Sequence, residues 1–469
     1  MKTFFTLFVC FFSVTVIAQG DCAKTFTKAI DKQDYKTASN AGENCKEVLK
    51  DEELKELLAA SFIHTSEFEK AKELYLELLA NNPNDADLNN ELGVVYHHLN
   101  ENENAIKYYR KAAIIDPQNK YALFNVGIIE YEQENYEAAL RDLNDFVKTH
   151  PNDADGFALL GDVYCADSSF QLGLNAYNNA LKIDPKCMKA YSGRADYYYN
   201  LELYDLALED IDEALKFDPE DAYNVYLKAD IYFLMDDDHF KEAEKWYLKS
   251  LALEEDGAVY YQLAQLYDYM DKIPEAVEAM EKSLAADPSA EQYADMAYFY
   301  SLNGDYEKAI SAADKAIALD EDELYYIYTK AGVYTDFEKY DEALELYNSL
   351  IEMDDSNSEY YFERAWIYDE TGENQKALDD YENCNLLEPN TDALYNRGCI
   401  FIDRKDYESA LVEFEKVIAI DDEYVDALTN IAVCYYQDSD MYMVCKYMRM
   451  AAELGDPDAH KYIKDNCGR

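Results

Sequence analysis

Apolar residues recur along this chain at helical intervals, in segments that are separated by short polar turns. Over residues 122–131 and 137–147 they fall at i, i+3, i+4 and i+7, which is the spacing of an amphipathic helix. The pattern therefore predicts paired helices, here Ala122–Tyr131 and Glu137–Val147, and an all-α fold.

The predicted helix pairs repeat at a fixed period. Ala71, Ala105 and Ala139 are 34 residues apart, and equivalent small residues continue to Ala410 with one widening to 36. Seven pairs end in a proline, which follows an aspartate in four of them; proline lacks an N–H and disfavours helix in the residue before it. Neither helix of a pair can bury its apolar face alone, so we expect neighbouring pairs to stack into one continuous core.

Each period has the same punctuation: a small residue, an aromatic three positions on, an alanine, an aromatic four further on, and a proline. Gly93, Tyr96, Ala105, Tyr109 and Pro117 show it. This pattern resembles the tetratricopeptide repeat. The resemblance implies a right-handed superhelical solenoid of about twelve helix-turn-helix repeats, whose first helices line a concave groove.

The two ends of the chain depart from the repeat. Residues 1–18 contain a basic residue, Lys2, followed by an apolar run too short to favour a membrane span. They are interpreted as a cleaved signal peptide rather than an uncleaved anchor. The junction at Gln19 resembles signal peptides common in Bacteroidota. Residues 19–52 are interpreted as a divergent capping repeat, 53–457 as the repeat array and 458–469 as a C-terminal capping helix. We expect an exported protein that is periplasmic, envelope-associated or secreted.

Charge excludes some classes of partner. The chain has 97 acidic and 42 basic residues and a formal charge of -55, which repels nucleic acid and anionic lipid headgroups. Its hydrophobic content of 49% nevertheless argues against disorder. We expect no nucleic-acid partner and no direct membrane insertion after signal cleavage.

Cysteine spacing leaves two alternatives open. Nine of the ten cysteines remain after residue 18, so at least one is free or intermolecular. Cys22 and Cys45 would face each other across the first helix pair, and Cys434 and Cys445 flank a later turn. Each pair forms a disulfide or consists of buried free thiols.

Catalytic and metal-binding patterns are missing. The six histidines are scattered over different repeats, and no nucleophile, phosphate-loop or zinc motif occurs. The run Asp236-Asp237-Asp238 lacks the spacing of a calcium loop and is expected to be solvated. We predict a protein that is not an enzyme, with no catalytic residue, cofactor or metal. Arg194, Arg364 and Arg397 are expected to pair with carboxylates of their own repeats rather than to bind a ligand.

The first helices contain the candidate partner-binding residues. Offsets −3, +1 and +4 from each small residue point away from the second helix, and aromatic and acidic residues are frequent there. Tyrosine offers apolar area and a hydroxyl, so these positions suit a peptide. Packing between neighbouring first helices is the alternative. The residues predicted to bind a partner are Tyr226, Asp230, Phe233, Tyr261, Asp268, Tyr328, Phe362, Trp366, Asp369 and Tyr395.

Two functions follow from this surface. The first is a non-enzymatic protein–protein interaction scaffold of the cell envelope or exterior, which binds an extended or basic segment of a protein or peptide partner. The alternative is a carbohydrate-associated scaffold of an envelope polysaccharide or secretion assembly, because aromatic rings also stack on sugars. Salt distinguishes them, since it weakens binding of a basic partner and hardly affects binding of a neutral glycan.

Overall fold

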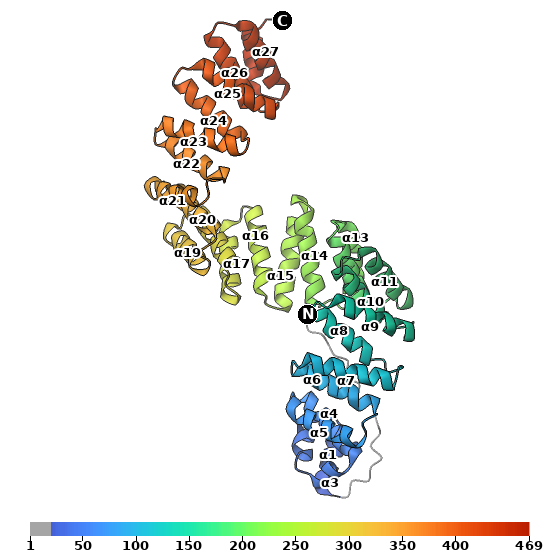
Figure 1. The fold of residues 1–469 in the computed structure, drawn as a ribbon. Helices are drawn as coiled ribbons and strands as arrows, with labels where there is room; N and C mark the ends of the chain where they lie inside the picture. Colours follow the sequence, from blue (N-terminus) through green and yellow to red (C-terminus); the bar gives the residue numbers. More distant parts are fainter. Residues whose placement is uncertain (1–19, 469) are drawn as a thin grey trace. The chain divides into compact units, whose positions relative to one another are not determined.

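The computed structural model describes residues 20–468, and within that range it contains helices and no strand (Figure 1). The predicted signal peptide, residues 1–18, lies outside the described residues. The chain divides into two compact units, residues 1–253 and 254–469. In each unit, helices that follow one another in the sequence pack side by side (Figure 1).

The helices of the first unit are α1 (Asp21–Ile30), α2 (Tyr35–Gly42), α3 (Lys46–Lys50), α4 (Glu52–His64), α5 (Phe68–Asn81), α6 (Ala86–His98), α7 (Asn102–Ile115), α8 (Ala122–Glu132), α9 (Tyr136–Thr149), α10 (Ala154–Ala166), α11 (Phe170–Ile183), α12 (Met188–Tyr199), α13 (Tyr204–Phe217), α14 (Ala222–Met235), the 3₁₀ turn η1 (Asp237–His239) and α15 (Phe240–Leu253).

The helices of the second unit are α16 (Gly257–Tyr269), α17 (Ile273–Ala286), α18 (Ala290–Leu302), α19 (Tyr306–Leu319), α20 (Leu324–Asp336), α21 (Tyr340–Met353), α22 (Ser358–Glu370), α23 (Asn374–Leu387), α24 (Thr391–Asp403), α25 (Tyr407–Ile420), α26 (Val425–Gln437), α27 (Met441–Glu453) and α28 (Pro457–Asn466).

The predicted fold class, an all-α solenoid of helix-turn-helix repeats, is confirmed. Twelve helix pairs run from α4/α5 to α26/α27. The two helices predicted from apolar spacing correspond to α8 and α9, each within two residues at both ends.

Local sequence determines where the helices begin and end. First helices commonly start after an aspartate whose side chain caps the helix, as Asp85 accepts from the backbone N–H of Leu88 at 3.0 Å. The turn after a first helix commonly contains a residue with positive φ, as at Glu134 (φ 59°) after α8. There the Asn135 N–H reaches the Glu130 carbonyl at 2.8 Å, which satisfies a carbonyl at the helix end. The acidic turns therefore have a structural use besides solubility.

Small residues let the two helices of a pair approach closely. A Cβ added at Gly127 would lie 2.5 Å from Cδ2 of Leu143, so no side chain fits there. The facing second-helix position is often a tyrosine with almost no exposed surface, as with Tyr109, Tyr177, Tyr247 and Tyr347. Part of the tyrosine excess therefore lies in the core rather than on the first helices.

The predicted cysteine pairing is half right. Cys22 and Cys45 form a disulfide, as one alternative held. A Cys434–Cys445 disulfide is wrong, because Cys445 bonds Cys467 instead, whereas Cys434 is a free buried thiol. The reason is that α28 packs on α27 and brings Cys467 within 5.6 Å of Cys445, measured between Cα atoms.

Candidate functional site

Three aspartates occupy the same position in three consecutive repeats of the first unit. Asp162 on α10, Asp196 on α12 and Asp230 on α14 are 34 residues apart, and each directly follows the small residue of its first helix. We call them the aspartate row. Asp162 and Asp196 are partly buried, and Asp230 is 7% exposed.

Tyrosine hydroxyls donate to every member of the aspartate row. Tyr177, on the second helix of the same repeat, donates to Asp162 Oδ1 at 2.7 Å. Tyr223, on the first helix of the next repeat, donates to Asp196 Oδ1 at 2.6 Å. The row therefore links second helices to first helices and one repeat to the next.

Asp230 accepts two such hydrogen bonds. The Tyr199 hydroxyl donates to Asp230 Oδ2, and Tyr247 donates to Oδ1 at 2.9 Å. Both carboxylate oxygens are therefore occupied within the chain. Asp230 is therefore better placed to hold Tyr199 and Tyr247 than to contact a partner directly.

None of the three aspartates forms a salt bridge within residues 20–468. Lys189, which acts electrostatically on Asp162, forms its salt bridge with Asp155 instead. Burial, reinforced by Asp196, raises the pKa of Asp162 to about 7 although the Tyr177 hydrogen bond opposes the rise. Burial likewise raises the pKa of Asp196 to about 6, against the hydrogen bond from Tyr223. A cation brought close would favour the ionised form of both groups.

The candidate residues of the first unit, Tyr226, Asp230 and Phe233, all lie on α14, and Asp230 is itself a member of the row. The Tyr226 ring lies 6.2 Å from that of Tyr247, and Phe233 packs edge-on against Phe240 at 5.9 Å, both measured between centroids. Both Tyr226 and Phe233 are partly buried. Their ring contacts show that each has a packing role, and partner binding by them stays a prediction.

The other seven candidates belong to the second unit, and all are partly buried. Tyr261 donates to Asp295 at 2.8 Å, and Asp295 also accepts from Gln265. Burial raises the pKa of both Asp268 and Asp369, and neighbouring carboxylates add to each rise. The remaining candidates make ring contacts: Tyr328 with Tyr347 and Tyr360, Phe362 with Tyr381, Trp366 with Tyr340, and Tyr395 with Phe414 and Tyr424.

One position in the second unit supports the predicted direction of these side chains. A Cβ built at Gly332, which has offset +1 in its repeat, would meet no atom within 4 Å. That offset therefore faces open space on α20. Asp162 has the same offset and could have been found from the sequence, whereas the hydroxyl contacts of the buried tyrosines could not.

Two of the three arginines pair as expected, with carboxylates of their own repeats: Arg194 with Asp210 (2.7 Å) and Arg364 with Asp380 (2.7 Å). Arg397 lies 3.9 Å from Glu413 of its own repeat but donates to Glu382 of the preceding repeat at 3.3 Å. Arg194 contacts both oxygens of Asp210 through Nε and a terminal nitrogen. Such a bidentate, largely buried pair serves the packing of two helices.

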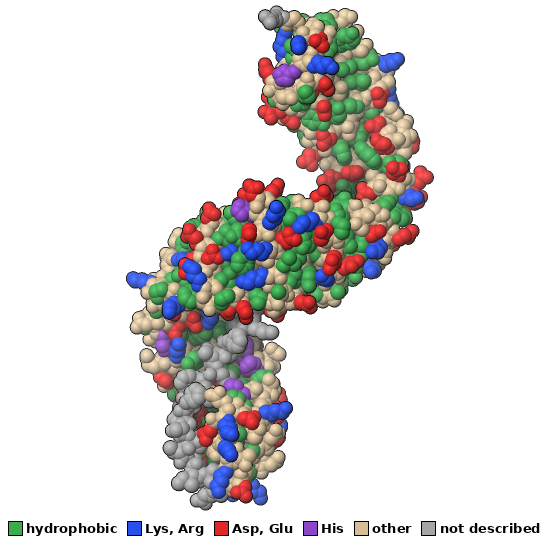
Figure 2. Space-filling model, turned by 180° about the vertical axis from the view of Figure 1, so that it is seen from behind, with side chains coloured by type: hydrophobic (Ala, Val, Ile, Leu, Met, Phe, Trp, Pro, Cys, Tyr) green, Lys and Arg blue, Asp and Glu red, His purple; other side chains and the backbone are tan. Residues whose placement is uncertain are grey.

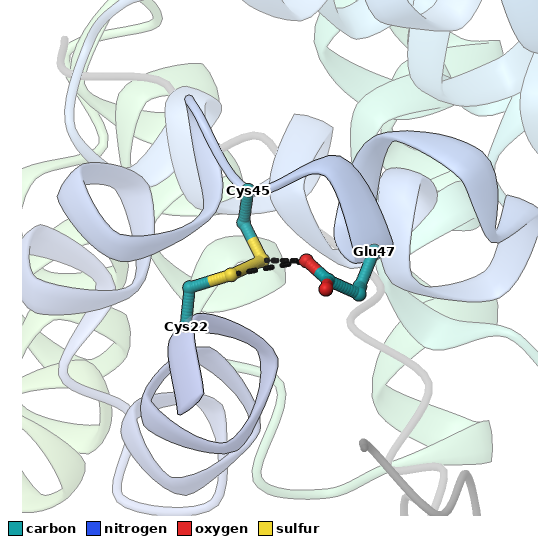
Figure 3. A group of neighbouring side chains, drawn as sticks. All are labelled: Cys22, Cys45 and Glu47. Atoms are coloured by element: carbon teal, nitrogen blue, oxygen red, sulfur yellow. Dashed lines mark hydrogen bonds between the residues drawn. A yellow bond between two sulfur atoms is a disulfide. The ribbon is translucent and has the colours of Figure 1, made fainter. Parts of the chain in front are cut away.

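One cluster of metal-type side chains occurs in residues 20–468, and it includes the first disulfide (Figure 3). Glu47 Oε2 lies 3.2 Å from Cys22 Sγ and 3.4 Å from Cys45 Sγ. Zinc is held by thiolates, and here both sulfurs are bonded to each other. In this oxidised form the cluster is not a suitable metal site.

On the face drawn in Figure 2, charge is spread out rather than gathered in one place. Figure 2 shows acidic side chains over much of the visible face, with basic side chains and apolar patches between them. Every helix between residues 20 and 468 is too short or too polar to cross a bilayer.

Comparison with protein families identifies the architecture. Two models described as tetratricopeptide repeat match residues 58–120, 124–186, 159–222 and 328–383 in one case, and 391–424 in the other. A model described as anaphase-promoting complex, cyclosome, subunit 3 matches residues 270–350. The tetratricopeptide matches cover more than half of the chain, which belongs to the tetratricopeptide repeat family. Repeats of this family are typically non-catalytic and form protein–protein interaction scaffolds, and that is the class of function this architecture supports.

Solved structures resemble the chain only in outline. Naa15/Naa10 bound to HypK-THB has a TM-score of 0.44 at 13% identity, with 95% of each chain covered. Yeast Tom70 has a TM-score of 0.44 at 15% identity, covering 87% of this chain and 93% of that one. PilF of Pseudomonas aeruginosa has a TM-score of 0.41 at 19% identity, covering 45% and 97%. Among curated proteins no relative matches the chain.

Proposed function

We propose that this protein is an exported scaffold of the cell envelope or exterior, which binds an extended, basic segment of a partner protein along its first helices. The observation that carries the proposal is the aspartate row, whose partly buried carboxylates form no salt bridge within residues 20–468 and have tyrosines on either side. Lysine or arginine side chains of a partner would supply the countercharge, and the tyrosine rings would supply apolar contact.

Export is supported by chemistry within the described residues. The chain contains two disulfides. Cys22–Cys45 lies within the first repeat, and Cys445–Cys467 lies within the last. Disulfides persist in oxidising compartments and are rare in the cytosol. The partner would therefore be met outside the cytoplasm.

The aspartate row can be tested with a labelled peptide that alternates lysine and phenylalanine, using fluorescence anisotropy. We expect the double variant Asp162→Asn, Asp196→Asn to bind it about tenfold more weakly, since losing two poorly solvated charges costs roughly 1.4 kcal/mol. Asparagine preserves size and can still accept from Tyr177 and Tyr223.

A matched control removes the same charge elsewhere in the unit. Asp205 and Glu209 on α13 are exposed, so Asp205→Asn with Glu209→Gln should leave affinity almost unchanged. Binding should weaken as salt is raised. Equal affinity of both double variants for the peptide would refute the proposal.

A further inference from the structure

Two consecutive repeats of the first unit expose large apolar side chains where their paired helices are joined. Two of these side chains lie at the start of α11, two lie in the turn between α12 and α13, and one lies at the start of α13. Each is between 41% and 50% exposed. We call them the turn patch: Phe170, Leu172, Leu201, Leu203 and Leu206.

Leu203 occupies a position where an apolar residue is unfavourable. It is the N-cap of α13, with φ -89° and ψ 61°, and makes no capping hydrogen bond. The residue directly before the second helix is polar in every other pair from α4/α5 to α26/α27. Asp406 has nearly the same backbone angles and caps α25 by accepting from the Ser409 N–H at 3.2 Å. Leucine is among the poorest N-cap residues, so Leu203 forgoes a cap and remains half exposed.

The other members limit the turn patch to these two repeats. Phe170 begins α11 and is exposed, whereas the aromatic residue at this position is partly buried in the repeats on either side. Leu172 and Leu206 are 34 residues apart, and each directly precedes the small residue of its second helix. The same position is Ala138 in the repeat before and Glu242 in the repeat after.

The two halves of the turn patch lie at the same edge of the first unit. Because α12 packs against α10, α11 and α13, the two repeats stack directly and their turns lie side by side. Packed helices are about 8–10 Å apart, which separates Leu172 from Leu206 by on the order of 10 Å. Residues i and i+7 on one face of an α-helix are also about 10 Å apart. One helix of a partner can therefore cover both halves.

The surroundings of the turn patch are acidic. Residues 166–173 and 200–209 contain no basic residue, and their carboxylates are all exposed: Asp167, Glu202, Asp205 and Glu209. These charges repel anionic lipid headgroups, and they repel a second copy of this chain, whose turn patch has the same carboxylates. A surface with an apolar centre and a basic rim is complementary.

We propose that the turn patch binds a basic amphipathic helix of a partner protein, with the apolar stripe of that helix on the five side chains and its lysine or arginine residues beside the carboxylates. Exposed apolar patches with a polar rim mark interaction sites, and an amphipathic helix binds them through residues at i, i+3, i+4 and i+7. This surface belongs to the turns and second helices. The inference therefore goes beyond the proposed function and does not depend on the aspartate row.

The probe is a labelled peptide of leucine and lysine, about 14 residues long, whose leucines recur at i, i+3, i+4 and i+7. Its binding to the full chain is measured by fluorescence anisotropy at about 0.15 M salt, which screens unspecific attraction to the acidic surface. The control peptide has the same composition in an order without helical period. We expect the periodic peptide to bind at least about tenfold more tightly, since only it presents an apolar face. Equal binding of the two peptides would refute the proposal.

Truncating two leucines tests the apolar centre. Leu172→Ala with Leu206→Ala keeps good helix formers in α11 and α13 and should weaken binding of the periodic peptide about tenfold, which corresponds to roughly 1.4 kcal/mol. The matched control is Leu76→Ala with Leu248→Ala, which removes two exposed leucines from α5 and α15 of the same unit. This control should leave the affinity unchanged. Equal affinity of the two double variants would rule out the turn patch as the binding surface.

The variant Leu203→Asp separates binding from folding. Aspartate can cap α13 as Asp406 caps α25, so the urea midpoint should rise. Affinity for the periodic peptide should nevertheless fall several-fold, although the added charge attracts lysine. A lower midpoint would mean that this leucine serves the fold, and undiminished affinity would mean that it does not contact the helix. Either result would overturn the proposal.

The rim of the turn patch and the aspartate row can be told apart by exchanging their variants. Asp205→Asn with Glu209→Gln should weaken the periodic peptide about threefold, whereas Asp162→Asn with Asp196→Asn should leave it unchanged. For the extended peptide that alternates lysine and phenylalanine, the order of the two double variants is the reverse. Loss of the periodic peptide in the Asp162, Asp196 variant alone would transfer the helix to the aspartate row and refute the turn patch.

Discussion

Replacing Gly398 by alanine tests whether close approach of paired helices holds the repeats together. A Cβ at Gly398 would lie 2.5 Å from Cε1 and 2.7 Å from Cζ of Phe414, and Phe414 is 0% exposed and cannot move into solvent. Overpacking of this kind costs about 1–3 kcal/mol, whereas alanine gains about 1 kcal/mol over glycine within a helix. The variant should therefore lose stability, by up to about 2 kcal/mol.

Gly332 provides the matched comparison, since it also lies inside a first helix of the second unit. A Cβ there meets no atom within 4 Å, so Gly332→Ala should keep the helical gain and stabilise the unit by about 0.5–1 kcal/mol. The two substitutions are chemically identical and are expected to have opposite signs. Only the packing around each glycine differs.

The assay uses the positions of the two tryptophans. Trp246 belongs to the first unit and Trp366 to the second, on α22 between the helices that carry the two glycines. In a Trp246→Phe background, urea denaturation followed by tryptophan fluorescence reports on the second unit. We expect the midpoint to fall for Gly398→Ala and to rise for Gly332→Ala at unchanged slope. Equal midpoints for the two variants would refute the reasoning.

Three other predictions concern ion pairing, pH and the second disulfide. Arg194→Met leaves the buried Asp210 carboxylate without its bidentate partner and should destabilise the first unit by about 3 kcal/mol in urea denaturation. The pKa of Asp196 is about 6 in the folded state, against an ordinary 3.8. Because the folded state keeps this proton up to a higher pH than the unfolded state does, the free energy of unfolding should fall as the pH rises from 3.8 to 6. The Asp196→Asn variant should flatten that part of the stability–pH curve. Replacing Cys445 and Cys467 by serine should cost about 3 kcal/mol, for a loop of 22 residues, and should expose α28 to limited proteolysis.

Each of these predictions has an outcome that contradicts it. Arg194→Met is compared with Lys148→Met, whose partner Asp145 is exposed, and equal losses would mean that burial of the pair is unimportant. If the free energy of unfolding of Asp196→Asn varied with pH as steeply as that of the unmodified protein, the pH dependence would have to come from other carboxyl groups. Unaltered proteolysis of the serine variant would mean that packing alone holds α28 against α27.

Much of the fold and part of the candidate site could be predicted from the sequence. The 34-residue period and the spacing within α8 and α9 depend on local rules, namely apolar periodicity, aspartate caps and Asp-Pro breaks. The first-helix offsets also identified Asp230 as a neighbour of the aromatic residues Tyr226 and Phe233. The same offset contains Asp162, which could have been found in this way.

What the sequence by itself determined is therefore the repeat: the helices, their pairing and the small residues at which they touch. Tertiary structure alone decided that both carboxylate oxygens of Asp230 accept from tyrosine hydroxyls and that Cys445 bonds Cys467 rather than Cys434. The physical reason is that local patterns specify which face of a helix a residue occupies. Contacts and pKa values depend on which atoms of neighbouring helices arrive opposite that face and on how far water is excluded.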